Sequence, residues 1–116
     1  MCSSDLPLLT GSLASAVVTG VQSTGRAACP KHFAANSQET RRQASDSVLD
    51  ERTLREIYLS AFETVVHEAR PQTIMSSYNK VNGTYANENP HLLRDILRDE
   101  WGFEGAIVTD WGGSNE

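Results

Sequence analysis

The chain has 116 residues and a formal net charge of −5, and its ten lysines and arginines are scattered along the sequence. This balance argues against nucleic acid or an anionic membrane surface as the main partner. Hydrophobic residues make up 39% of the chain, enough for a packed core, but no apolar run approaches the ~20 residues of a membrane span. No basic start with an apolar middle marks an export signal, so the compartment stays undetermined.

The first six residues, MCSSDL, are polar and share no periodicity with the residues after them. A possible coding sequence for them resembles the end of a common sequencing adapter. We therefore expect residues 1–6 to be a non-native or disordered start, and residues 7–116 to be part of one domain of a longer protein. Cys2 and Cys29 have no metal-ligand spacing, so they predict neither a disulfide framework nor a zinc site.

Residues 7–24 carry apolar side chains at helical spacing, and Gly25 is a natural stop for a helix there. The apolar positions are Leu9, Leu13, Ala16, Val17 and Val21. Residues 27–32 then predict a short buried strand, although Pro30 removes a backbone donor from it. The polar stretch 33–49 predicts a long loop.

A second helix is predicted from Asp50, a favourable N-cap residue followed by Glu51 in the first turn. Pro71 marks its end. Its apolar positions form an amphipathic pattern facing a core. They are Leu54, Ile57, Tyr58, Ala61, Phe62, Val65 and Ala69.

Residues 73–77 predict the next strand, and the Asn- and Gly-rich stretch 78–89 a loop. Asn89 and Pro90 signal a third helix, which Gly102 closes. Its apolar residues are Leu92, Leu93, Ile96 and Leu97, with Trp101 expected in the core at its end. A last strand, GAIVTD, follows over residues 105–110.

The alternation of strand and helix predicts parallel strands joined by right-handed crossovers. Polar residues come directly after each strand: Lys31 with His32, then Tyr78, then Asp110. The carboxyl edge of parallel strands is where α/β proteins bind ligands, so we expect these side chains to share one rim. At such a place Asp110 is a candidate nucleophile, metal ligand, phosphate acceptor or helix cap.

Several of these chemistries lack their partners. A phosphate acceptor needs further acids for Mg²⁺, and a metal site needs ligands at suitable spacing. His67 and His91 are expected at the surface, and no GxGxxG motif follows a strand. One carboxylate among cations, a tyrosine and a tryptophan suits a sugar, whose hydroxyls pair with charged groups and whose apolar face packs on an indole.

Four blocks carry a resemblance over nearly the whole chain: KHFAANSQETRR, LDERTLREIYLSAFE, IMSSYNKVNGTYANEN and LLRDILRDEWGFEGAIVTDWGG. In this order and spacing they resemble glycoside hydrolase family 3, in its β-glucosidase-like branch. The resemblance implies an α/β fold that is part of a (β/α)8 TIM-type barrel, about three β/α units with parallel strands. It implies hydrolysis of terminal β-linked glycosides with retention of configuration at the anomeric carbon, without a cofactor or metal.

Residue by residue, the resemblance implies that Asp110 is the nucleophile. It places the substrate-binding residues at Lys31, His32, Arg42, Met75, Tyr78 and Trp111. A cation close to Asp110, from Lys31 or Arg42, would keep that carboxylate ionised. Tyr78 would orient Asp110 if the Tyr78 hydroxyl reached the carboxylate. Of the adjacent Arg41 and Arg42, the family register favours the second.

The resemblance also implies partners that these residues lack. The acid/base of the family lies far downstream, often on a second domain, and no glutamate here has a matching context. We therefore expect the chain to need the remainder of a barrel and that domain, and to be inactive alone. The alternatives are a non-catalytic carbohydrate-binding module and a non-functional truncated fragment. The sugar, linkage, aglycone and oligomeric state stay open.

Overall fold

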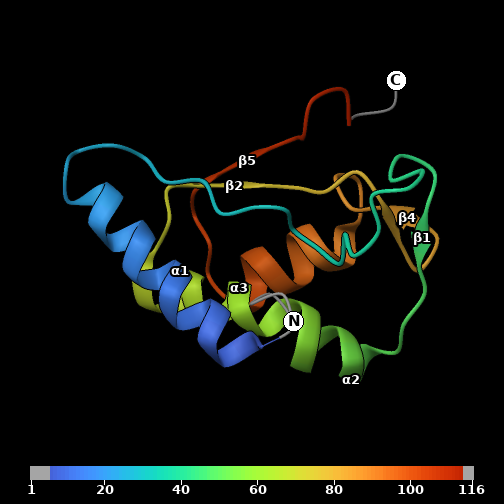
Figure 1. The fold of residues 1–116 in the computed structure, drawn as a ribbon, viewed down its shortest axis with the longest axis horizontal. Coiled ribbons are helices and arrows are strands. Elements are labelled where there is room, and N and C mark those ends of the chain that lie inside the picture. The colour runs from blue at the N-terminus through green and yellow to red at the C-terminus, as the bar shows by residue number, and fades with distance from the viewer. Residues whose placement is uncertain (1–5, 114–116) are drawn as a thin grey trace.

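The computed structural model describes residues 6–113 as a mixed α/β arrangement, in which helices pack against one side of extended segments (Figure 1). The expectation for the first five residues, and any pairing of Cys2, lie outside the described part. In that part the strands form a two-stranded and a three-stranded sheet and do not close into a barrel.

Helix α1 (Pro7–Gln22) confirms the first predicted helix, and Gly25 follows it with a φ of 77°. Its buried face is not the apolar stripe, however. Gly11 and Ser15 are buried, and a Cβ on Gly11 would lie 3.0 Å from Thr64 Cβ. Small residues therefore let α1 approach α3 closely. The expected apolar positions are all exposed: Leu9, Leu13, Ala16, Val17 and Val21.

The second predicted helix forms in three continuous parts: α2 (Glu51–Thr53), η2 (Leu54–Leu59) and α3 (Ser60–Ala69). Asp50 caps it as predicted, since its Oδ1 accepts the Thr53 N–H at 2.7 Å. The left-handed Arg70, with a φ of 47°, ends it.

The η2 part has the wider turn of a π-helix, and it changes which residues reach the core. Leu54 and Leu59, five positions apart, are 1% and 0% exposed, whereas Ile57 is 49% exposed. The prediction of a core position at Ile57 is therefore wrong. A regular 3.6-residue period does not hold through a π-helical turn.

Strands β2 (Thr73–Met75) and β5 (Ala106–Val108) pair in parallel, with Ile74 opposite Ile107. The helix between them, η3 (His91–Glu100), is also π-type and ends before Gly102, whose φ is 68°. Its apolar residues Leu92, Ile96 and Leu97 are fully buried, as expected.

The strand predicted over residues 27–32 is not formed, which corrects that expectation. The chain there is extended and joins β2 through a few backbone bonds: the Pro30 carbonyl accepts the Met75 N–H at 3.0 Å, and Phe33 N–H donates to the Met75 carbonyl at 2.8 Å. Phe33 also bridges Ser76 in parallel. Pro30 has no N–H of its own to extend a regular ladder.

The two predicted loops contain a small sheet. Strand β1 (Asp46–Ser47) pairs in parallel with β3 (Lys80–Val81), which pairs antiparallel with β4 (Thr84–Tyr85). Asn82 and Gly83, with φ of 50° and 89°, form the hairpin turn. Strands of two residues in polar sequence give no periodic signal.

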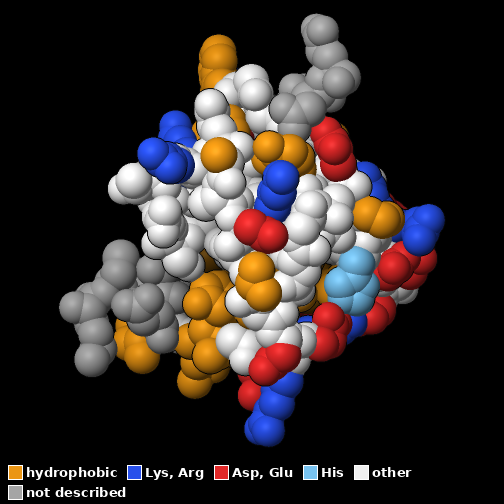
Figure 2. Space-filling model, turned by 90° about the vertical axis from the view of Figure 1, so that its right-hand side faces the viewer, with side chains coloured by type: hydrophobic (Ala, Val, Ile, Leu, Met, Phe, Trp, Pro, Cys, Tyr) orange, Lys and Arg blue, Asp and Glu red, His pale blue; other side chains and the backbone are white. Residues whose placement is uncertain are grey.

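The core lies between the helices and the extended segments. Phe33 is at its centre, fully buried, with edge-to-face contacts to Phe62 at 5.1 Å and to Trp101 at 6.0 Å between ring centroids. Trp101 therefore packs in the core, as predicted. Figure 2 shows a face of the molecule where acidic and basic side chains are interspersed, in keeping with the scattered charge.

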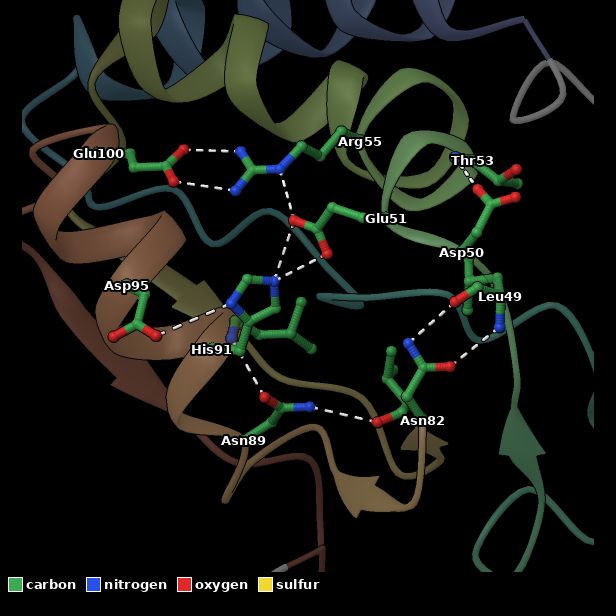
Figure 3. Close-up of polar contacts among 12 residues, drawn as sticks. Leu49, Asp50, Glu51, Thr53, Arg55, Asn82, Asn89, His91, Asp95 and Glu100 are labelled. Carbon is green, nitrogen blue, oxygen red and sulfur yellow. Dashed lines mark hydrogen bonds and ion pairs between the residues drawn. The ribbon is translucent and has the colours of Figure 1, made fainter.

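A charged network joins the second helix to η3 (Figure 3). Arg55 binds Glu100 through two bonds of 2.6 and 2.9 Å, and donates to Glu51 at 2.6 Å. The His91 ring lies 3.0 Å from the Glu51 carboxylate and 3.8 Å from the Asp95 carboxylate. Hydrogen bonds from Arg55 lower the pKa of Glu51 and of Glu100. His91 is thus a surface residue, as predicted, and so is His67.

Candidate active site

Three segments bring polar residues to one edge of the parallel strands. The segment at Pro30 and Phe33 runs beside β2, and β2 runs beside β5, where Ser76 N–H donates to the Val108 carbonyl at 2.9 Å. Lys31 and His32, Tyr78, and Asp110 follow these paired segments and therefore lie at the same edge. Figure 1 shows β2 and β5 side by side above the helices. The predicted shared rim is present in this arrangement.

Asp110 is held at this edge by its own backbone turn. Its Oδ1 accepts the Trp111 N–H at 2.8 Å, and its carbonyl accepts the Gly113 N–H at 2.8 Å. The residue is 8% exposed. The second oxygen, Oδ2, lies 3.4 Å from His32 Nε2. One carboxylate oxygen is thus fixed by backbone, and the other faces the imidazole.

The group beside Asp110 differs from the expected one. In the described part of the chain His32 lies within 3.4 Å of the Asp110 carboxylate, whereas Lys31 is exposed and Arg42 pairs with Glu39. The expectation that Lys31 or Arg42 lies close to Asp110 and keeps it ionised is not met in this part of the chain. Of the two neighbours Lys31 and His32, the half-buried His32 is the one that faces the carboxylate.

Tyr78 also has a different partner from the one expected. Its side chain is buried, and its hydroxyl donates to the Trp111 carbonyl in place of the Asp110 carboxylate. A Cβ on Gly113 would lie 3.4 Å from the Tyr78 ring, so the turn packs against that ring. Tyr78 therefore stabilises the turn that carries Asp110, and it acts on the carboxylate only through that turn.

The backbone conformation of the loop gives its two adjacent arginines different positions. Arg41 has a φ of 54° and is exposed. Arg42 turns back to the rim, where its guanidinium carbon lies 4.6 Å from the centre of the Tyr78 ring. The structure thus brings Arg42, and not Arg41, to the predicted site.

Trp111 and Met75 occupy contrasting positions. Trp111 follows Asp110 and is 87% exposed, so its indole lies free at the edge. Met75 is half-buried in β2, in register with Val108. Their contact with a substrate stays a prediction.

Sequence reasoning missed a polar bracket beneath the rim. Asn79 is 1% exposed, and its Nδ2 donates to the carbonyls of Ala34 and Ala35 at 3.3 and 3.2 Å. Ser77 Oγ adds a bond to the Ala34 carbonyl at 3.0 Å, and Ser47 Oγ one to Ala35 at 2.8 Å. This bracket fixes the backbone just after His32. The only sequence signal is that small polar residues follow a strand.

A groove of about 720 Å³ opens beside the rim, between α1, the second helix and the segment of residues 30–37. Lys31 and His32 lie on it, and apolar residues such as Phe62 and Val65 form its floor. Within residues 6–113 no group of three or more His, Cys, Asp or Glu is arranged to hold a metal ion. In the same range, no helix has the length and apolar character needed to cross a membrane.

Comparisons with known proteins agree on one family. The model of the Glycosyl hydrolase family 3 N terminal domain matches residues 3–116. A beta-glucosidase of Rhizobium radiobacter is 55% identical over 114 residues, 98% of this chain and 14% of that protein. An exo-alpha-(1->6)-L-arabinopyranosidase of Bifidobacterium longum is 50% identical over 113 residues, 97% of this chain and 15% of that protein.

Solved structures give the same result. Beta-glucosidase 3B from Thermotoga neapolitana, in complex with glucose, has a TM-score of 0.90 at 53% identity, over 90% of this chain and 15% of that chain. The chain therefore spans 14–15% of the length of these relatives.

Proposed function

This chain belongs to glycosyl hydrolase family 3, and from that membership and the geometry of its strand edge we propose that it supplies the nucleophile of a retaining β-glycosidase. The observation that supports this most directly is the placement of Asp110. Its carboxylate stands at the carboxyl edge of parallel strands, fixed by the turn through Gly113, with His32 beside one oxygen and the free indole of Trp111 next to it.

In the proposed reaction, an Asp110 oxygen attacks the anomeric carbon while the bond from that carbon to the leaving oxygen breaks. A second carboxyl group, about 5–5.5 Å from the first in retaining enzymes, gives the leaving oxygen its proton. Water then attacks the anomeric carbon of the covalent sugar–Asp110 ester, the bond from that carbon to the Asp110 oxygen breaks, and the water gives its proton to the same second group. We propose that this second group comes from outside these 116 residues.

The remaining rim residues would hold the sugar. Lys31, His32 and Arg42 offer N–H donors to hydroxyl groups, and the exposed face of Trp111 offers an apolar wall for the ring. The proposed substrates are terminal β-linked glycosides of the glucose type. The relative from Bifidobacterium longum, named for a different sugar, shows that identity near 50% leaves the sugar open.

The function can be tested by placing this chain in a complete enzyme. Residues 6–113 would replace the matching segment of the Rhizobium radiobacter beta-glucosidase, giving a chimera that is assayed with an aryl β-glucoside. We expect turnover with retention, seen by proton NMR of the first-formed sugar. We expect Asp110→Asn to lower kcat by more than about a thousandfold.

A 2-fluoro glycoside separates catalysis from mere binding. We expect mass spectrometry to find the trapped sugar on Asp110 of the chimera. Sugar binding without an adduct would favour a carbohydrate-binding module, and an inverted product would rule out the nucleophile. The 116-residue chain alone serves as the control, because we expect it to be inert without the second carboxyl group.

A further inference from the structure

We propose that Glu39 is a positioning residue of this site, whose carboxylate holds the Arg42 guanidinium over the Tyr78 ring so that its free donors face the rim. The inference rests on the proposed function, because Arg42 is a sugar ligand only there. It gives Glu39 a role through Arg42 and no contact with the substrate.

The ion pair is prepared by a turn of the backbone. Arg42 N–H donates to the Glu39 carbonyl at 3.2 Å, which brings the two side chains, three positions apart, to the same side. Glu39 Oε2 then accepts from Arg42 Nη1 at 2.9 Å. The left-handed Arg41 between them is turned away, with its carbonyl accepting the N–H groups of Ala44 and Ser45. The loop therefore selects one arginine for the rim.

Tyr78 provides the second constraint on Arg42. Its ring is buried and its hydroxyl is bonded to the Trp111 carbonyl, so it is a fixed platform for the guanidinium 4.6 Å away. Stacking on a ring leaves the edges of a guanidinium free for hydrogen bonds. Of the five N–H donors of an arginine, the described part of the chain shows one bonded to Glu39. The others remain for a ligand.

The other carboxylate oxygen ties this pair to the segment that contains His32. Asn36 Nδ2 lies 3.4 Å from Glu39 Oε1, and Asn36 lines the groove together with Lys31 and His32. Arg42 is 43% exposed at its side chain, so packing alone does not hold it. A long exposed side chain loses rotamer freedom when it binds a ligand, and a partner that orders it beforehand reduces that loss.

The kinetic test compares variants of the chimera with the Rhizobium radiobacter enzyme. We expect Glu39→Gln to raise KM for an aryl β-glucoside by about fivefold with kcat nearly unchanged, the pattern of lost uniform binding. Fivefold is about 1 kcal/mol at 1.36 kcal/mol per tenfold, the upper range for an exposed ion pair. Glu104→Gln, an exposed glutamate at the opposite end of β5, should change neither constant.

Two further variants separate positioning from general stability. Arg42→Met should raise KM more than Glu39→Gln does, and adding Glu39→Gln to Arg42→Met should have little further effect, because the charged partner of Glu39 is already lost. Additive effects, or a fall in kcat with unchanged KM, would overturn the proposal.

A readout without turnover keeps the two proposals distinguishable. In the 116-residue chain, NMR relaxation of the Arg42 side-chain Nε–H should show increased motion in Glu39→Gln. In Glu104→Gln the motion should equal that in the original chain. Unchanged motion in Glu39→Gln overturns the positioning role, even where the chimera is active. A folded but inert chimera overturns the proposed function, while increased Arg42 motion would still support the ion pair as the element that orders this side chain.

Discussion

Gly105 allows β5 to start against β2, and replacing it with alanine should separate the two strands. A Cβ at this position would lie 2.3 Å from the Gln72 carbonyl oxygen and 2.6 Å from Phe103 Cζ. Phe103 is buried, and the Gln72 oxygen accepts the Ala106 N–H at 2.9 Å, so neither can move without loss. Overpacking costs about 1–3 kcal/mol and a lost hydrogen bond about 0.5–1.5 kcal/mol. Together these predict that Gly105→Ala destabilises the chain by about 1.5–4.5 kcal/mol.

Thermal unfolding followed by circular dichroism measures this effect. For a domain near 100 residues, 1 kcal/mol corresponds to roughly 4–5 °C, so Tm should fall by about 6–22 °C. Gly20→Ala is the matched control, because nothing lies within 4 Å of its added Cβ and it is inside α1. Alanine is preferred there by about 0.5–1 kcal/mol, and Tm should rise by a few degrees.

The reasoning would be refuted if Gly105→Ala left Tm within about 3 °C of the original chain, less than 1 kcal/mol on the same scale. It would also be refuted if both glycine variants fell equally, since steric contact would then not distinguish them. In a chimera, the same shift of β5 should displace Asp110 from His32, so activity should fall together with stability.

Two other predictions concern polar contacts. Arg55→Met should lower the urea midpoint at pH 7 but much less at pH 3, because Arg55 lowers the pKa of Glu51 and Glu100. Stability from a lowered carboxyl pKa is fully present above the pKa of the unfolded state, about 4.3, and is lost as pH falls through the pKa of the folded state. An equal fall in the urea midpoint at both pH values would contradict this. Tyr78→Phe leaves the Trp111 carbonyl without its donor and should cost about 0.5–1.5 kcal/mol in urea unfolding, with faster hydrogen exchange in the adjoining turn. Unchanged exchange there would show that the hydroxyl does not hold the turn.

Helix ends were predictable because their signals are local. Asp50 accepts a backbone N–H of the first turn as its residue type predicts, and Gly102 takes the positive φ that ends η3. The core face of the second helix was only partly predictable. The π-helical turn exchanges Ile57 for Leu59, and no residue type in that stretch signals such a turn.

The candidate site, too, was predictable only in part. Strand order along the chain was sufficient to bring Asp110 and His32 to one edge. Individual partners were not predictable, because they depend on where an extended segment points its side chains. For example, the Tyr78 hydroxyl donates to the carbonyl of Trp111 and not to the Asp110 carboxylate, and Arg42 pairs with Glu39.

The wide turn of η2 has a consequence for how sequences of this kind align. It accommodates an extra residue between Leu54 and Leu59 while both remain in the core. Deleting one exposed residue there, such as Glu56, would let the helix close as an ordinary α-helix with four-residue spacing. A single deletion should therefore be tolerated at this point of the chain, whereas elsewhere in a packed helix it would rotate every later residue out of place.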